Sequence, residues 1–280
     1  YHEVAGTLDD PALREALAAC PAGQRTAVRK RSALVFGSGW APTFAMAACA
    51  AVLVVGGGVL WRAYGPETLP TRHFETARGQ MLSVRLADGS RVELNGNTSL
   101  DVQIGRRGRL VSLHRGQAFF DVVHEAQRPF EVRTVRSRAV VLGTAFDLDL
   151  TRRGVELSVY RGRVRFGSVA QSVATVDVDA GRRTVLWDQA PGPLSRFDAT
   201  QEDWRQGWLD TDGISLGRLV EELNRRAGPY IVSQTPRIAA IRISGRFKLN
   251  DPDQLLEALG QSYDFRVIRH GGRLLLAPNG

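Results

Sequence analysis

The chain has 280 residues, 24% charged and 43% hydrophobic, a composition typical of globular proteins with room for about two domains. Its formal net charge is +8, but all of its 37 basic residues except Lys30 and Lys248 are arginines, spread along the predicted strands rather than gathered in a stripe. This pattern argues against nucleic acid as a partner, because nucleic acid is usually bound by a basic stripe or patch. No cysteine follows Cys49, so a disulfide framework is excluded for the rest of the chain.

Residues 1–31 are predicted to be the end of a helical domain followed by a basic tether. Asp10 and Pro11 begin a helix, with Asp as the N-cap and Pro at the first helical position, and the helix ends before Pro21. One short amphipathic helix cannot fold alone. Because the chain also begins with Tyr1 rather than Met, we expect more of this domain to precede it.

Residues 41–61 are predicted to form a single transmembrane helix. They lie in a run from Ser32 to Trp61 that contains no Asp, Glu, Lys, Arg or His. A helix needs roughly 20 apolar residues to cross a hydrocarbon core of about 30 Å. The alternatives are a cleaved signal peptide and a buried core helix. Residues 1–31 make a long start for a signal peptide, and the uncharged run exceeds most core helices.

The residues that flank this segment predict its orientation. Its N-terminal side carries Arg29, Lys30 and Arg31, whereas Arg62 stands nearly alone after the interfacial Trp61. The positive-inside rule therefore places residues 1–31 in the cytoplasm and the chain after Arg62 on the other side of the membrane.

Residues 73–190, which follow a linker at 62–72, are predicted to form a mainly β domain. Hydrophobic and polar residues alternate on both sides of a hairpin turn at Asp88-Gly89, and the pattern recurs at Arg115-Gly116 and Arg161-Gly162. We expect about ten short antiparallel strands, or eleven, without a helix among them. The spacing of the turns indicates a sandwich or strands stacked as in a solenoid.

The polar residues of this domain predict neither an enzyme of diffusible substrates nor a cofactor or metal site. No nucleophile elbow or phosphate-binding loop is present. Asp147 and Asp149 alternate with hydrophobic residues on one strand, which indicates a solvated outer face rather than a cation site. The five histidines show no metal-ligand spacing: His2, His73, His114, His124 and His270.

One peptide bond, Gly143-Thr144, is a candidate for self-cleavage, and it lies within a single strand predicted over VVLGTAFDLDL (140–150). Gly143 allows the backbone to twist, and the Thr144 hydroxyl can attack the preceding carbonyl to form an ester. The alternative is a β-bulge glycine beside a residue that favours strands.

Residues 204–280 are predicted to form a small α+β domain after a Pro/Gly linker at 191–193. Ser215 caps a helix with an apolar stripe, and Asp251-Pro252 begins a second helix. Short strands are expected at 230–232, at 238–247 and at 265–270, and the last strand, RLLLAP (273–278), is expected at a sheet edge.

Taken in order, these pieces resemble the FecR family of inner-membrane anti-sigma regulators. The motifs that carry the resemblance are LADGSRVELN (86–95), RGQAFFDVV (115–123), RPFEVRT (128–134), VLGTAFDL (141–148) and VYRGRV (159–164). The C-terminal domain looks like the STN fold of secretins and TonB-dependent transducers. This second likeness rests on element order and on SGRFKLNDPDQLLEAL (244–259).

The resemblance implies a function and several partners. The cytoplasmic part would bind an extracytoplasmic-function sigma factor, and the periplasmic part would contact the N-terminal signalling domain of a TonB-dependent outer-membrane receptor. The signal would reach the sigma factor through periplasmic and intramembrane proteases and control iron-siderophore uptake genes. Some family members cleave themselves at the bond that matches Gly143-Thr144. This chain departs from the family in lacking most of the sigma-binding domain.

Two other functions remain as alternatives to the anti-sigma function. A membrane-anchored periplasmic scaffold, or a secretin-associated protein, would share the anchor and the C-terminal fold without any role in transcription. A nucleic-acid binder would use the arginine excess, and its binding would weaken with salt.

Overall fold

The computed structural model describes residues 70–279 except 107, 171–174, 188–189 and 202. The predicted cytoplasmic remnant at 1–31, the membrane helix at 41–61 and the flanking Arg29, Lys30, Arg31, Trp61 and Arg62 lie outside these residues. Among the residues that the structure does describe, none belongs to a helix long and apolar enough to span a membrane. All of them fall within one compact unit, Pro66–Gly280.

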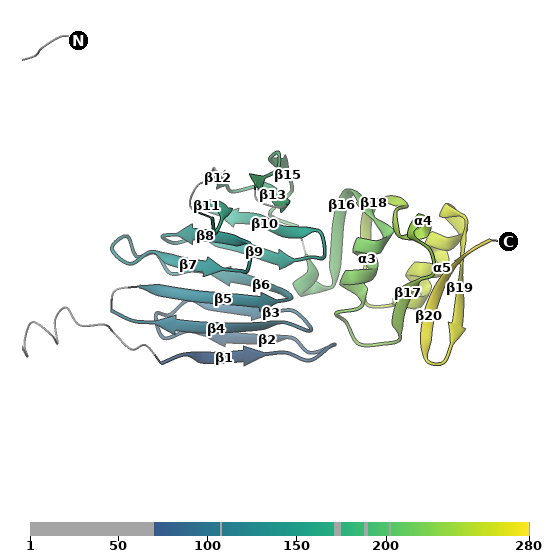
Figure 1. Ribbon diagram of the computed structural model, residues 1–280, viewed down its shortest axis with the longest axis horizontal. Helices are drawn as coiled ribbons and strands as arrows, with labels where there is room; N and C mark the ends of the chain where they lie inside the picture. The colour runs from purple at the N-terminus through teal and green to yellow at the C-terminus, as the bar shows by residue number, and fades with distance from the viewer. Residues whose placement is uncertain (1–69, 107, 171–174, 188–189, 202, 280) are drawn as a thin grey trace, which may run out of the picture. The chain divides into compact units, whose positions relative to one another are not determined.

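Two β-sheets form the first part of this unit (Figure 1). The first sheet has the order β1 (Arg72–Glu75), β4 (Ser99–Ile104), β5 (Arg109–Arg115), β7 (Phe130–Arg133), β8 (Ser137–Val141), β11 (Arg163–Ser168) and β12 (Val176–Asp179). The second has the order β2 (Leu82–Arg85), β3 (Arg91–Leu94), β6 (Gln117–Asp121), β9 (Ala145–Leu150), β10 (Gly154–Arg161), β13 (Arg182–Trp187) and β14 (Ala190–Pro191), with β15 (Ser195–Arg196) also paired to β13.

Both sheets take their strands in chain order, so the architecture combines the two predicted alternatives. The chain alternates between two facing sheets, as in a sandwich, and advances steadily along both, as in a solenoid. The mainly β prediction is confirmed, with more strands than expected, because β1 to β13 lie between Arg72 and Trp187. The run VVLGTAFDLDL, predicted as one strand, is the end of β8 and all of β9, which belong to different sheets.

Glycines with positive φ mark the turns between these strands. Gly89 (φ 85°) lies in the hairpin between β2 and β3, as predicted. Gly116 (φ 85°) and Gly162 (φ 83°) have the same conformation, but each joins strands of opposite sheets and therefore makes a corner. A Cβ on Gly116 would lie 2.3 Å from Thr98 Oγ1, so this corner has no room for a side chain.

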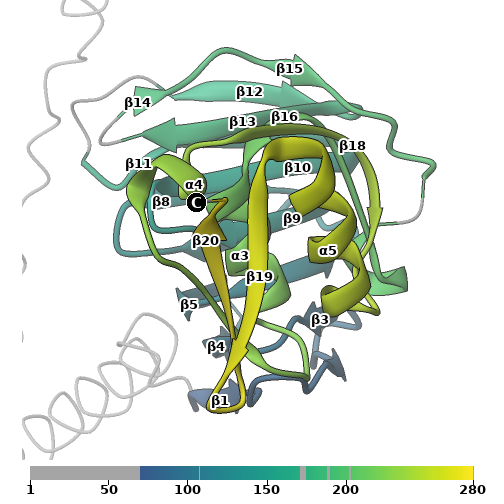
Figure 2. The same cartoon turned by 90° about the vertical axis from the view of Figure 1, so that its right-hand side faces the viewer.

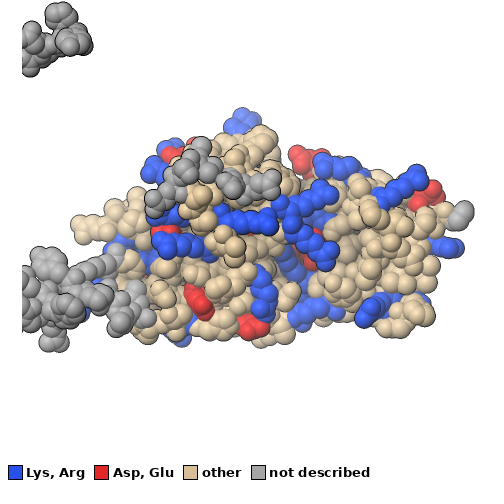
Figure 3. All heavy atoms as spheres, viewed as in Figure 1, with Lys and Arg blue, Asp and Glu red and all other residues tan. Residues whose placement is uncertain are grey.

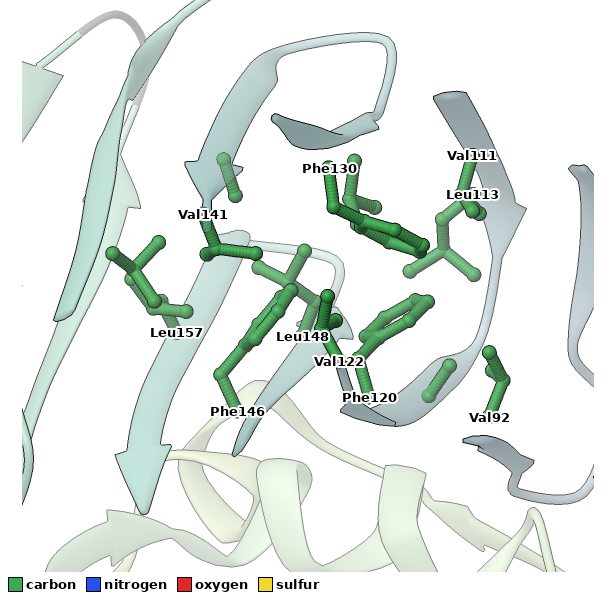
Figure 4. Packing of buried hydrophobic residues seen from close by; sticks show 14 of the residues in the cluster. Val92, Val111, Leu113, Phe120, Val122, Phe130, Val141, Phe146, Leu148 and Leu157 are labelled. Carbon is green, nitrogen blue, oxygen red and sulfur yellow. The ribbon is translucent and has the colours of Figure 1, made fainter. Parts of the chain in front are cut away.

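The core of the sandwich is apolar and draws on both sheets (Figure 4). Phe120 of β6 stacks on Phe146 of β9 with ring centroids 5.1 Å apart, and Phe130 of the other sheet lies 6.2 Å from Phe120. All three rings are fully buried. Burying one such side chain contributes about 1.5–3 kcal/mol, so this aromatic cluster is a large part of what holds the sheets together.

The second part of the unit is a small α+β module with its own core. Its helices are α3 (Leu216–Leu223), α4 (Pro236–Ala239) and α5 (Pro252–Tyr263), and a short 3-10 helix, η1 (Trp204–Gln206), leads into it. Its strands form two sheets, β16 (Trp208–Ser215) with β18 (Arg242–Lys248), and β17 (Tyr230–Ser233), β20 (Arg273–Pro278) and β19 (Phe265–His270) in that order.

The predicted helix starts of this module are confirmed. Ser215 Oγ accepts from the Arg218 backbone N–H at 3.3 Å, and Asp251 Oδ1 accepts from that of Gln254 at 3.0 Å. The expected strand at 238–247 is shorter, because Thr235 caps and Pro236 begins helix α4. The edge position of RLLLAP is wrong: β20 lies between β17 and β19, with α5 packed beside β19 (Figure 2).

Candidate functional site

The Gly143-Thr144 bond lies in the corner between β8 and β9, not within a strand as the sequence suggested. Gly143 packs against His124, and a Cβ on Gly143 would lie 2.5 Å from His124 Cα. The bulge interpretation is therefore wrong, because glycine is needed here for the close approach of another loop.

Thr144 is buried, and its hydroxyl donates to the Arg163 carbonyl at 3.0 Å. Its own carbonyl accepts from the Val122 N–H at 3.0 Å, so both neighbouring strands hold it. Just before it, the Leu142 carbonyl accepts from the Glu125 N–H at 2.8 Å. The corner is thus fixed on both sides of the candidate bond.

A buried arginine supports the loops at this end of the sandwich. Arg109 has no exposed side-chain surface and pairs with the equally buried Asp88 at 3.0 Å. It also donates to the carbonyls of Val123 and Arg128 at 3.0 and 2.9 Å. Charged hydrogen bonds of this kind are worth about 1.5–3 kcal/mol each, and leaving one partner buried alone costs more. Sequence reasoning did not single out Arg109, which looks like any other strand arginine.

A second group of buried charged and polar side chains, besides Arg109 and its partners, lies between the sandwich and the α+β module. The two parts have separate apolar cores. Between these cores lies a group of polar side chains, each nine-tenths or more buried, which we call the polar layer: Asn95, Gln117, Asp147, Asp149, Glu222 and Arg225, with Arg218 partly exposed beside them.

Asp149 of β9 is the centre of the polar layer. Its two carboxylate oxygens accept from Arg225 and Arg218 of the α3 segment. Arg225 Nη1 also donates to Glu222 Oε2 and to Gln117 Oε1, both at 2.9 Å. Burial disfavours the ionised Asp149, but the Arg218 and Arg225 guanidinium groups outweigh it and hold the pKa of this carboxyl below its ordinary value.

Asp147 is held differently on the same strand face. It accepts from Gln117 Nε2 at 2.9 Å and from the indole Nε1–H of Trp204 at 2.8 Å. Neither donor is charged. Burial, with the nearby Asp149 carboxylate, therefore raises the pKa of Asp147 well above its ordinary value.

The expectation of a solvated outer face for Asp147 and Asp149 is wrong. Their exposed fractions are 5% and 1%, because η1 and α3 cover this face of β9. Strict alternation of apolar and acidic residues normally indicates a half-exposed strand. The covering residues, Trp204 and Arg225, lie far from β9 in the sequence. No local pattern near β9 predicts that they cover the two aspartates.

The structure also gathers residues that the sequence left apart. Pairing of β1 with β4 and of β4 with β5 brings His73 and His114 to the two oxygens of Asp101, at 2.7 and 2.9 Å. These side chains are half-exposed. Within the described residues no group of His, Cys, Asp or Glu has a geometry that would hold a metal ion. Figure 3 shows the Lys and Arg side chains dispersed over the visible face.

Together these features define a two-sheet β domain closed by a small α+β module, with charged side chains buried where they meet. Residues 72–165 match the family model described as FecR protein. The resemblance drawn from the motifs is thereby confirmed for this stretch, which contains Gly143, Thr144 and both aspartates of the polar layer.

The chain is also similar in fold to solved structures. Two crystal structures, at 2.50 and 1.65 Å, of a protein from Parabacteroides distasonis described as a candidate anti-sigma factor align with a TM-score of 0.68 at 22% identity. Each alignment covers 75% of this chain and 100% of that one, which is more than the sandwich alone. Among curated proteins no match was found.

Proposed function

We propose that this chain is a single-span anti-sigma regulator of the bacterial inner membrane. Its cytoplasmic part would restrain an extracytoplasmic-function sigma factor, and its periplasmic part would receive the signal. The match of residues 72–165 to the FecR model is the observation that carries the proposal. The fold shared with a protein described as a candidate anti-sigma factor supports it. The basic residues before the apolar segment at 41–61 support the orientation.

The signal would come from the signalling domain of a TonB-dependent receptor that reports iron-siderophore uptake. The STN-like α+β module, predicted at 204–280, is the surface we propose for that contact. Strand addition to a sheet edge is one common way for such modules to bind. Because β20 is central in the three-stranded sheet, the open edges of that sheet belong to β17 and β19. Asn224 occupies the β17 edge by bonding both the N–H and the C=O of Ile231 at 2.8 Å, so β19 is favoured.

The module and the sandwich have separate main cores. They meet through the polar layer and one small apolar cluster, in which Trp204 packs on Phe119 and Ala145, and such a joint suits a relay. Receptor binding would change how the module is held, and proteases of the periplasm and the membrane would then act near the span. Asp149 lies toward one end of β9, and the Gly143-Thr144 corner adjoins the other. The corner remains a candidate for self-cleavage.

The sigma-factor assignment is tested by cross-linking in cells. The natural full-length chain, tagged at its C-terminus, is cross-linked in its own host, and its partners are identified by mass spectrometry. The proposal predicts a sigma factor of the extracytoplasmic class, lost when residues before the membrane segment are deleted. Recovery of envelope proteins alone, without any sigma factor, would contradict it and favour a periplasmic scaffold.

A further inference from the structure

The turn between β1 and β2 closes over the C-terminal end of helix α3. Arg78 Nε donates to the Asn224 carbonyl at 2.7 Å, and Arg78 Nη2 donates to that of Pro229 at 3.0 Å. The Gly79 N–H donates to the Arg225 carbonyl at 2.8 Å. Carbonyls at a helix C-terminus lack partners within the helix and favour a nearby cation. The β1–β2 turn therefore caps α3 from outside the module.

Two glycines make this contact sterically tight. A Cβ on Gly96 would lie 2.0 Å from the Arg225 carbonyl oxygen, and a Cβ on Gly79 would lie 2.9 Å from Ala227 Cβ. Backbone thus packs directly on backbone, without side chains that could rotate away. A small shift of α3 must therefore move the turn or break its hydrogen bonds.

Strand β1 is the element that this turn holds in place. It has four residues, lies at the edge of its sheet and pairs with β4 alone. Its side-chain ion pairs, His73 with Asp101 and Glu75 with Arg115, join exposed groups and contribute little. Phe74 is partly buried against the sandwich core, and Thr76, just after β1, donates its hydroxyl to the Asn95 carbonyl at 2.6 Å. Short edge strands with exposed hydrogen bonds are among the first parts of a protein to open. β1 is also the strand that follows the predicted membrane linker at 62–72.

We infer that the C-terminal module acts as a latch, which means that its attachment to the sandwich keeps β1 paired in its sheet. While the polar layer holds α3 against the sandwich, the β1–β2 turn is capped on α3 and β1 stays in its sheet. When the module moves, Arg78 and Gly79 lose their acceptors, β1 detaches and the linker becomes longer and more accessible. This inference rests on the proposed function, since a relay of a signal toward the membrane needs such a step. The contacts that support it do not depend on that function.

The polar layer makes this movement feasible without unfolding. The main apolar cores of the two parts are separate, so opening would expose mainly charged groups that water solvates well and the small cluster of Trp204 with Phe119 and Ala145. Arg218 Nη1 is already buried without a hydrogen bond, and it lies 3.7 Å from Glu222 Oε2. Loss of one charge should therefore loosen the joint while both cores remain folded.

Hydrogen exchange followed by mass spectrometry tests the latch in the purified full chain in detergent. Asp149→Asn removes the charge that holds Arg218 and Arg225, at a residue that does not touch β1. Gly96→Ala, in the turn between β3 and β4, places a methyl group 2.0 Å from the Arg225 carbonyl oxygen and 3.1 Å from the Gly79 nitrogen, so it forces α3 and the β1–β2 turn apart. Each variant should accelerate exchange in α3 and in β1 by about tenfold or more, as expected for the loss of one charged hydrogen bond, and leave β5 and β6 protected. Matched controls are Asp179→Asn in an exposed ion pair and Gly108→Ala in open space.

The outcomes are decisive in both directions. Acceleration of β1 together with α3 supports the latch. Acceleration of α3 without β1, or of neither element in either variant, overturns it. Should Asp149→Asn expose the sandwich core as well, Arg218→Gln decides in its place, because it removes one partner of Asp149 at a partly exposed position on α3. The sample contains no sigma factor, receptor or protease, so failure here leaves the anti-sigma proposal standing, and failure of the sigma-factor capture leaves the latch standing.

Discussion

Asp149 lies between two guanidinium groups, and its charge determines how the polar layer responds to mutation and to pH. Asp149→Asn removes the charged partner that the buried Arg225 and the partly exposed Arg218 share, which should lower the free energy of unfolding by about 3 kcal/mol at neutral pH. Because the folded-state pKa of Asp149 is depressed, this contribution is fully present above the pKa of the unfolded chain, about 3.9, and is lost as the pH falls through the folded value.

Urea unfolding of the wild type and Asp149→Asn over a pH series checks this. The stability difference should be largest near pH 7 and shrink below about pH 4. Asp147, whose pKa is raised mainly by burial, contributes a slope of opposite sign in both proteins, and this slope is smaller in Asp149→Asn because the neighbouring carboxylate is gone. A difference that does not change with pH would show that Asp149 acts through packing rather than charge. Asp179→Asn, in an exposed pair, should leave the urea midpoint unchanged.

Thr144 carries the chemistry of the candidate self-cleavage. Attack of Oγ on the Gly143 carbonyl would break the peptide C–N bond, form an ester and free the Thr144 amine. Water would then release the Gly143 carboxylate and restore the hydroxyl. Thr144→Ser should still cleave, whereas Thr144→Ala should give one intact chain. Thr144→Val keeps the shape but loses the hydrogen bond to Arg163, so it separates chemistry from packing.

Denaturing electrophoresis of protein made in a host without periplasmic proteases gives the readout. Two bands for the native sequence and Thr144→Ser, against one for Thr144→Val, are expected. One full-length band for the native sequence would leave Gly143 as a corner glycine that serves only to admit His124.

At the scale of elements, Asn224 substitutes for a missing strand. Its side-chain amide bonds both backbone groups of Ile231 on the open side of β17. Asn224→Ala should lower the free energy of unfolding by about 1–2 kcal/mol, because two partly buried backbone groups lose their partner. Asn279→Ala, which removes an exposed bond to Asp264, is the matched control and should leave the unfolding midpoint unchanged. Equal effects of the two substitutions in thermal unfolding would contradict the edge-capping role.

Local patterns predicted the elements better than their partners. The helix starts at Ser215 and Asp251 and the hairpin at Gly89 follow from residues within a few positions. The division of VVLGTAFDLDL into two strands does not, because it depends on which sheet each half joins. The central position of β20 between β17 and β19 and the burial of Asp149 likewise depend on segments distant in the sequence. The polar layer was therefore beyond local reasoning, although the motifs that contain Gln117 and Asp147 had pointed to the family.

Across the whole molecule, one prediction and two observations combine into a single relay. The chain after residue 62 is expected outside the cytoplasm, the α+β module is clasped to the sandwich by buried charges, and the same module caps the turn after β1. A signal received by the module would thus reach the strand nearest the predicted membrane span. Neither core would need to unfold, since each is complete by itself.

We propose that the attachment of the α+β module to the sandwich governs transcription through a sigma factor. RNA sequencing tests it most directly, in cells with the native gene, with the gene deleted and with Asp149→Asn on the chromosome. Immunoblots would confirm that the variant is made at the normal level. The account predicts that Asp149→Asn alters the transcripts of the same set of genes as the deletion. A deletion without any transcriptional effect, or a deletion that alters a set of genes which Asp149→Asn leaves at parental levels, would contradict it.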